Sequence, residues 1–316
     1  MKKKWLLQLL GIALFIYILF SVDIQMLLLQ LQKVTIGWLI FSAIVLSGVY
    51  LLKSLRWKVL LHRLGIRYSY KNALLAFTSA NLIAFVTPGR LGEVAKSVYV
   101  KNDVNQPISF TLPTVILDRI FDVYTLLFFA MYGILKYAIF KSFNVTTYII
   151  IGLLIVLPVV MINHQFLKYL DTWMNKRKIF QPIQIYLQMF MNAIGRFNVM
   201  VIISSEAITL LAYGVLFIVA WAIGKSMGLD FTFMEYAMFI SVANILSFLP
   251  ISVAGLGTRE ASLVFLFAIF GVSSEVAVLY AMLIFVVFYV IGGLFGYICF
   301  ILKPLDLKGL RLTKLK

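Results

Sequence analysis

Long apolar runs, separated by short polar or charged stretches, recur along the whole chain. They cover roughly residues 6–20, 37–52, 73–87, 110–135, 148–162, 199–223, 233–249, 261–270 and 276–301. A transmembrane helix needs about 20 apolar residues and tolerates about 17–25, which the longest runs reach easily. Because 63% of the residues are hydrophobic and 13% charged, a soluble domain could not bury so much apolar surface. The sequence predicts an all-α, polytopic integral membrane protein with about six to nine hydrophobic segments.

Lysine and arginine gather in four segments, and the net charge is +16. These segments are residues 2–4, 53–71, 163–198 and 303–316. Loops rich in Lys and Arg stay on the cytoplasmic side, so all four segments are expected there, with both termini cytoplasmic. Each run is interpreted as a topology signal that also contacts anionic lipid headgroups. Nucleic acid is not an expected partner, because the chain offers neither a soluble domain nor a binding groove.

The alternation of sides predicts two helical hairpins that enter the membrane without crossing it. If 73–87 crossed completely, the basic segment 163–198 would face the wrong side. If 73–87 instead dips in and returns through 88–109, all four basic segments lie on one side. The pair 233–249 and 261–270 then begins and ends outside. It is either two crossings or a second re-entrant hairpin, and the shortness of 261–270 favours the hairpin.

Two similar motifs lie at the tips of these predicted hairpins. NLIAFVTPGRLGE (81–93) and NILSFLPISVAGLGTRE (244–260) both begin with Asn, place Phe fifth, continue through a proline and end on glycines, Arg and Glu. Opposed broken helices in two halves of a chain point to a transporter-type site near the membrane midplane. The candidate halves of an inverted repeat are 1–135 and 148–301. The alternative is that so short a repeat is coincidental.

The residues of the two tips interrupt helices in a defined way. The helix-breaking and pocket-forming residues are Pro88, Gly89, Gly92, Pro250, Ser252, Gly255 and Gly257. Proline lacks a backbone donor and stops the preceding helix, while glycine lets the chain turn and approach another group closely. Freed N–H groups at the start of the next half-helix form a weak anion site. Exposed backbone at this depth is tolerated only in a covered cavity, so a pocket is predicted; a bend needed only for packing is the alternative.

A few charged residues fall inside the apolar runs, and they are the candidate substrate-binding residues. DRIFD places Asp118 and Asp122 on one helical face, with Arg119 three residues before Asp122. The full set is Arg90, Glu93, Asp118, Arg119, Asp122, Arg259 and Glu260. Charges at such depth usually pair and face the interior. The set can largely neutralise itself and still leave an arginine for a ligand phosphate; a purely structural ion-pair network is the alternative.

Three stretches carry a resemblance to a known family. TPGRLGEVAKS (87–97), LDRIFD (117–122) and LPISVAGLGTREASL (249–263) resemble the signatures of the lysylphosphatidylglycerol synthase transmembrane region, or flippase-like domain family. The resemblance covers nearly the whole chain and implies one flippase-like transmembrane domain over 1–316. In the full-length members, the multiple peptide resistance factors, this part is similar to a lipid flippase. A soluble domain there transfers lysine from lysyl-tRNA to phosphatidylglycerol, and this chain, ending at Lys316, is expected to lack it.

The resemblance implies a lipid flippase or transporter, with a link to antimicrobial peptide resistance. The absence of a disulfide frame, since the chain has one cysteine, and the basic cytoplasmic face suit a plasma membrane of bacterial type. The transporter's partner would be a phosphatidylglycerol, lysylphosphatidylglycerol or polyprenyl-phosphate lipid, and no cofactor or metal is expected. One alternative is a membrane-embedded transferase related to phosphatidylglycerol lysyltransferase or to lipid glycosylation. It ranks lower because the sequence shows no DxD metal pair on a loop and no nucleophile–histidine arrangement. A second alternative is a non-transporting scaffold for a separate lipid-modifying enzyme.

Overall fold

A computed structural model describes residues 22–137, 163–175, 181–247 and 255–306, together with Tyr17, Phe20 and Gly152. All regular elements in this part of the chain are helices, which confirms the predicted fold class. Within it, three helices are long and apolar enough to cross a membrane. They are α3 (Ile36–Arg63), α10 (Val199–Ser226) and the continuous helix Ser274–Leu302. Apart from the three single residues, the predicted runs 6–20 and 148–162 lie outside the described residues.

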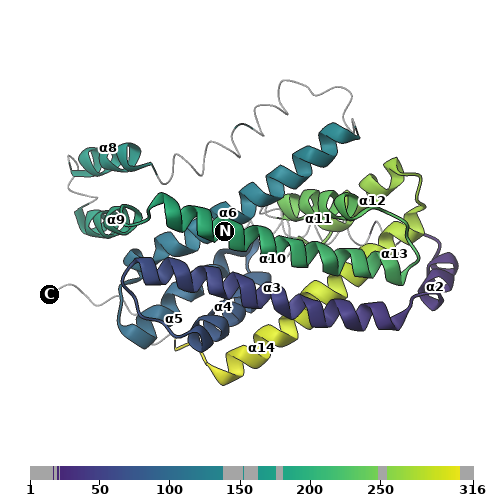
Figure 1. Ribbon diagram of the computed structural model, residues 1–316, viewed down its shortest axis with the longest axis horizontal. Helices are drawn as coiled ribbons and strands as arrows, with labels where there is room; N and C mark the ends of the chain where they lie inside the picture. The colour runs from purple at the N-terminus through teal and green to yellow at the C-terminus, as the bar shows by residue number, and fades with distance from the viewer. Residues whose placement is uncertain are drawn as a thin grey trace.

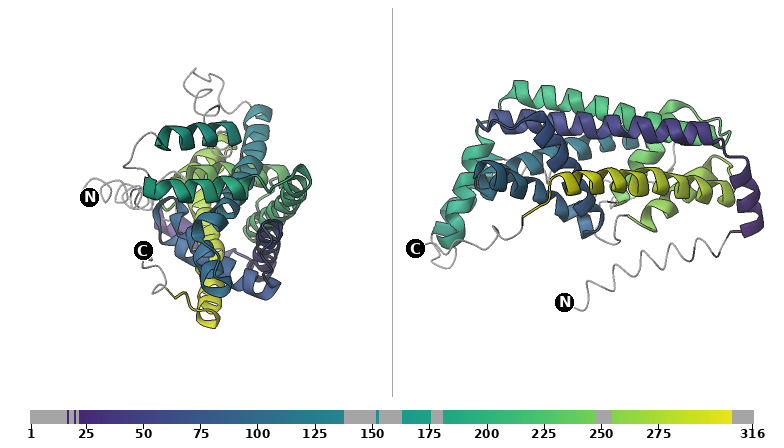
Figure 2. Two further views of the ribbon diagram at one scale, coloured as in Figure 1. Left: turned by 90° about the vertical axis from the view of Figure 1, so that its left-hand side faces the viewer. Right: turned by 90° about the horizontal axis from the view of Figure 1, so that it is seen from below.

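The long helices form the frame of the molecule. α3 and α10 lie side by side along its long axis (Figures 1 and 2). The continuous helix consists of α13 (Ser274–Phe285), a π-helical stretch η3 (Val286–Ile291) and α14 (Gly292–Leu302). Helix α6 (Ile108–Lys136) has 29 residues, also long enough to span, but it carries the three charges of DRIFD.

The first predicted hairpin is present. Helix α4 (Tyr70–Phe85) has 16 residues, so at about 1.5 Å per residue it is too short to cross a hydrocarbon core of about 30 Å. The chain turns through the 3₁₀ segment η1 (Pro88–Val94) and returns along α5 (Ala95–Val104). The two helices pack against each other, and Ser69 caps the start of α4 by accepting a hydrogen bond from the Asn72 N–H at 3.2 Å.

A second helix pair has the same form. Helix α11 (Phe233–Ser247) and helix α12 (Thr258–Ile269) are 15 and 12 residues long and pack against each other. The segment between them includes Pro250 and Ser252, which lie outside the described residues. Because both helices are this short, their lengths agree with the prediction that the pair forms a hairpin rather than two crossings.

The two hairpins enter the molecule from opposite ends (Figure 1). At the end where α3 finishes, Arg63 donates a 2.6 Å hydrogen bond to the carbonyl of Arg196, and α4 begins. At the other end, the Thr35 N–H donates to the Ser226 carbonyl at 2.8 Å, and Tyr137 donates to the Glu235 carboxylate at 2.7 Å beside the start of α11. We call these the basic end and the opposite end. The assignment of the basic end to the cytoplasm stays a prediction.

Short helices lie at the two ends. Helix α2 (Ile24–Gln32) runs across the opposite end (Figure 2), and Asp23 caps it by accepting from the N–H groups of Gln25 and Met26 at 2.8 and 3.2 Å. Helices α8 (His164–Asn175) and α9 (Gln181–Ile194) pack together at the basic end, where α9 contacts α6. Each of these two helices has one polar face and one apolar face, which suits a helix that lies at a membrane–water interface.

Candidate functional site

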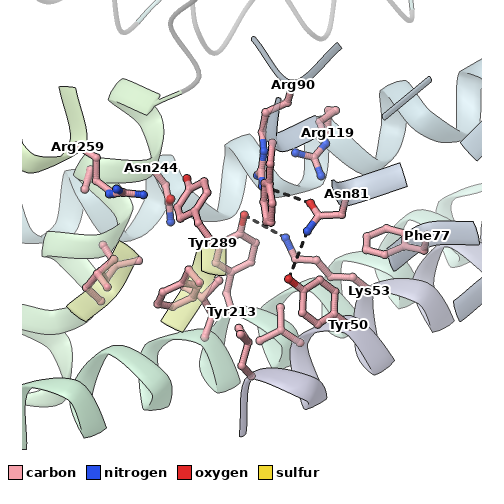
Figure 3. Close-up of a pocket in the computed structure, with 18 residues that line it drawn as sticks. Tyr50, Lys53, Phe77, Asn81, Arg90, Arg119, Tyr213, Asn244, Arg259 and Tyr289 are labelled. Atoms are coloured by element: carbon pink, nitrogen blue, oxygen red, sulfur yellow. Dashed lines mark hydrogen bonds between the residues drawn. The ribbon is translucent and has the colours of Figure 1, made fainter. Parts of the chain in front are cut away.

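A pocket lies where the two hairpin tips meet the long helices (Figure 3). Its empty volume is about 800 Å³, including the part open to solvent. The apolar lining consists of Leu46, Val49, Phe77, Phe85, Leu216, Ile240, Ala243, Ile284 and Phe288. The polar lining consists of Tyr50, Asn81, Tyr213, Asn244 and Tyr289, with four cations, Lys53, Arg90, Arg119 and Arg259. Among the described residues, no Asp or Glu side chain lines the pocket.

Equivalent residues of the two sequence motifs face each other across this pocket. Asn81 and Arg90 come from the first motif, and Asn244 and Arg259 come from the second. Figure 3 shows each asparagine beside the arginine of its own motif, with Tyr289 between the two pairs. Residues of both sequence motifs therefore line one cavity in the fold, and the inverted repeat itself stays a prediction.

Arg90 is held in an unusual backbone conformation. Gly89 and Arg90 both have left-handed dihedrals, with φ of 57° at each residue. This conformation costs a non-glycine residue about 1 kcal/mol or more, and such strain concentrates at functional positions. The side chain donates to Asn81 Oδ1 at 3.3 Å and lies over the ring of Phe85 at 5.5 Å. Within the described part of the chain, no carboxylate lies within ion-pair distance of Arg90.

Lys53 and Arg119 connect the pocket to a buried charge network. Lys53 Nζ lies 3.0 Å from Asp122 Oδ2 and 4.4 Å from the centre of the Tyr213 ring. Arg119 lies 2.8 Å from Glu93 through Nε and 2.8 Å from Asp122 through Nη2. Its side chain is 24% exposed, so one side of the guanidinium is bound by carboxylates and the other faces the cavity.

Behind the pocket, carboxylates of α6 and η1 bind cations from two other helices. The fully buried Arg56 donates to Asp118 at 2.8 Å and to Asp122 at 2.9 Å. Lys96 bridges Asp118 at 2.6 Å and Glu93 at 3.0 Å. The network thus joins four cations, Lys53, Arg56, Lys96 and Arg119, to three anions, Glu93, Asp118 and Asp122. Burial of so many charges is tolerated because each anion lies within ion-pair distance of at least two cations.

Four guanidinium nitrogens of the pocket are buried without a hydrogen-bond acceptor among the described residues. They are Nε and Nη1 of both Arg119 and Arg259, although Arg119 Nε lies within ion-pair distance of Glu93. Arg259 pairs with Glu260 through its remaining nitrogen and lies over the ring of Tyr289 at 4.5 Å. A buried donor left without an acceptor costs about 1–3 kcal/mol. These nitrogens are therefore suited to an anionic ligand.

The hairpin tips depend on close backbone contacts. The Gly92 N–H donates to Thr87 Oγ1 at 2.8 Å, and a Cβ on Gly92 would lie 2.6 Å from the backbone of Ile83. In the second hairpin Gly255 and Gly257 have φ of 74° and 88°, a region that disfavours other residues. Glu260 accepts from the Gly257 N–H at 2.6 Å and so caps α12.

A comparison with known families matches residues 5–296 to the lysylphosphatidylglycerol synthase TM region. The chain belongs to this family. This confirms the resemblance carried by the three motifs, and it makes the protein a membrane protein. A UPF0104 membrane protein of Methanocaldococcus jannaschii is 22% identical over 288 residues, which span 84% of this chain and 84% of that protein. No solved structure matches the chain.

The structure divides the family-motif residues that the sequence singled out into three groups. Arg90, Arg119 and Arg259 line the pocket. Glu93, Asp118 and Asp122 lie behind it and bind cations, whereas Glu260 caps α12. Of the tip residues, Pro88 begins η1 and the four glycines form the turns, while Pro250 and Ser252 lie outside the described residues. The binding roles assigned to this set stay predictions.

The structure corrects one part of the sequence interpretation. The charge pattern predicts a basic loop at the membrane surface over 53–71, but α3 continues to Arg63 and buries Lys53 and Arg56 in the core. Helix continues there because the carboxylates of α6 neutralise both cations. The sequence does contain a sign of these buried cations, because the candidate set of charged residues holds more acids than bases. The missing cations are Lys53, Arg56 and Lys96, the last of which lies inside the motif TPGRLGEVAKS.

Proposed function

We propose that this family member binds the phosphate of an anionic membrane lipid in the pocket and moves the headgroup between the two leaflets. The observation that carries the proposal is the lining, which has four cations, no acid among the described residues, and buried guanidinium donors without acceptors. Arginine suits this ligand because its planar fork binds phosphate oxygens through two parallel hydrogen bonds.

The apolar lining of the same pocket favours a lipid over a free anion. Nine apolar side chains line the cavity together with the cations, and the Arg90 guanidinium lies over the ring of one of them, Phe85. A ligand in the cavity would therefore meet both charge and hydrocarbon. Ligand sites typically combine such an apolar lining with a few convergent polar groups. A phosphatidylglycerol-type or polyprenyl-phosphate lipid has this chemistry, with one phosphate joined to long alkyl or prenyl chains.

The position of the pocket supports transport rather than storage. Arg90 and Arg259 belong to hairpins that enter from opposite ends. A headgroup between them is within reach of both halves, as expected for alternating access around a site near the midplane. The carboxylates nearby are poor candidates for acid–base catalysis, because Glu93, Asp118 and Asp122 are each paired with at least two cations. This arrangement favours the transporter over the transferase alternative.

The test is lipid translocation in proteoliposomes. Purified protein is reconstituted with fluorescent phosphatidylglycerol, its lysylated form or a fluorescent polyprenyl phosphate, and the outer-leaflet dye is quenched chemically. The decisive variant is Arg90→Asn, because asparagine tolerates the left-handed backbone that Arg90 adopts. We expect its transport rate at limiting lipid to fall about tenfold or more, the effect of losing a charge-assisted hydrogen bond.

A matched control removes a cation that is far from the pocket. Arg67 is exposed in the turn between α3 and α4, so Arg67→Gln should leave translocation unchanged although it removes the same charge. Folded wild-type protein that translocates none of the three lipids would overturn the proposal. A change in cellular lipid composition on deletion of the gene would then favour the transferase or scaffold alternative.

A further inference from the structure

A second cavity, which we call the α14 groove, opens between α3, α4 and α14. Its walls include Ser47 and Leu51 of α3, Leu74 of α4, and Phe295 and Ile298 of α14. Its empty volume is about 510 Å³, including open space. On each helix the lining includes residues three or four apart, so each helix contributes one continuous face.

The groove offers hydrocarbon and is open to the outside of the bundle. The Ser47 hydroxyl donates to the carbonyl of Ile44 at 2.7 Å, so it is satisfied within its own helix. Leu51 and Ile298 at the mouth are 42% and 54% exposed. Leu51 lies near the middle of α3, and Ile298 lies one turn before the end of α14. On a protein in a bilayer, apolar side chains exposed on a spanning helix face the lipid chains. The groove is therefore a lateral opening toward the hydrocarbon core.

Tyr50 joins the groove to the cationic pocket. It lines both cavities, with its ring edge-on to Phe295 at 6.2 Å and its hydroxyl accepting from Asn81 Nδ2 at 3.4 Å. A Cβ on Gly292 would collide with this hydroxyl, so the glycine leaves the space that Tyr50 occupies. Tyr50 lies near the middle of α3 and one turn before Lys53, so hydrocarbon and charge meet at this residue.

We propose that the α14 groove takes one hydrocarbon chain of the lipid whose phosphate occupies the pocket, with Tyr50 at the junction of chain and headgroup. The inference rests on the proposed function and adds the route, which is lateral entry beside α14. Lipid tails are as apolar as the groove, so transfer of the chain from bilayer to groove provides little affinity. The groove instead guides the chain while the cations bind the headgroup.

Photo-crosslinking tests the position of the chain. The protein is reconstituted in phosphatidylcholine vesicles that contain a small fraction of phosphatidylglycerol with a diazirine in one acyl chain. We expect crosslinks to be several-fold enriched on Leu74 and on Phe295–Cys299 relative to Leu211 of α10, which is 63% exposed but lies outside the groove. Crosslinks no more frequent in the groove than on Leu211 would show annular lipid only and would overturn the inference.

Two tryptophan variants on one helix provide the matched comparison. Leu51 lines the groove and Leu55, one turn further, does not, although the two are 42% and 38% exposed. Leu51→Trp should fill the groove and reduce both crosslinking and translocation several-fold, whereas Leu55→Trp should leave both unchanged. Equal effects of the two variants would contradict the groove as the route of the chain.

A soluble probe separates this inference from the proposed function. Binding of glycerol 1-phosphate, which has a phosphate and no chain, reports on the cationic pocket alone. Wild-type and Leu51→Trp proteins should bind it equally, and Arg90→Asn should bind it more weakly. If glycerol 1-phosphate binds but the groove is not crosslinked, the groove inference fails alone. If the groove is crosslinked but the probe does not bind, the phosphate pocket and with it the proposed function fail.

Discussion

Arg56 lies in the core of a membrane protein with no exposed side-chain surface, a position that only its partners make acceptable. It binds both carboxylates of DRIFD and also donates to Thr209 at 2.8 Å. A charge in such a place is costly unless it is paired and hydrogen-bonded. The network therefore ties α3 to α6 and α10 at one point, and it fixes the orientation of Arg119 toward the pocket.

Removal of one member of this network should destabilise the protein strongly. Asp122→Asn takes a negative charge from Lys53, Arg56 and Arg119 together, and breaking a buried pair typically costs about 3–5 kcal/mol. The measurement is the free energy of unfolding by denaturant titration in detergent micelles. The control is Asp230→Asn, which removes the acid of the exposed Lys225–Asp230 pair at 3.2 Å and should change stability little. Equal effects would show that the network contributes no more than a surface pair.

The acidic half of this network is visible in the sequence, and the basic half is not. Asp118 and Asp122 stand out because they interrupt an apolar run on one helical face. Lys53 and Arg56 follow the run 37–52 directly, so their charge is indistinguishable from that of a cytoplasmic loop. Only the packing of α3 against α6 shows that they are buried, and that contact is not encoded in local sequence.

At the scale of elements, the first hairpin depends on how closely its tip folds back on α4. Gly92→Ala would place a Cβ 2.6 Å from the backbone carbonyl of Ile83, and backbone cannot yield as a flexible side chain can. We expect this variant to lower the thermal unfolding temperature and reduce lipid translocation. Gly214→Ala is the control, because a Cβ added to Gly214 in α10 would meet nothing within 4 Å, and alanine should stabilise the helix by about 0.5–1 kcal/mol. An unaffected Gly92→Ala protein would contradict the tight tip.

Helix ends are predictable where local signals mark them and unpredictable where a distant partner extends the helix. The run 276–301 closely matches the helix Ser274–Leu302, and 73–87 matches α4 within a few residues, since a proline follows it. The run 37–52 ends eleven residues before Arg63, where α3 ends. The π-helical stretch η3, which brings Phe288 and Tyr289 to the pocket, has no marker in the sequence that would reveal it.

At the scale of the whole molecule, charge is unequal between the two ends. Arg63, Arg67, Lys71 and Arg196 are at or near the basic end, whereas Asp230, Glu235 and Glu275 are at the opposite end. Cytoplasmic loops carry the excess of Lys and Arg. The charge argument therefore predicts that the first hairpin lies on the cytoplasmic side and the second hairpin on the other.

This orientation predicts a labelling pattern for single cysteines. In a Cys299→Ala background, Arg67→Cys and Asn102→Cys flank the first hairpin, while Asp230→Cys and Ser274→Cys flank the second. A membrane-impermeant maleimide should label the second pair in intact cells and the first pair only after permeabilisation. If Arg67→Cys and Asn102→Cys were labelled from different sides, α4 and α5 would have to cross the membrane together, and the re-entrant hairpin would be wrong. If both pairs were reversed, the hairpins would stand and only the assignment of the basic end to the cytoplasm would fail, because the two members of each pair would still share a side.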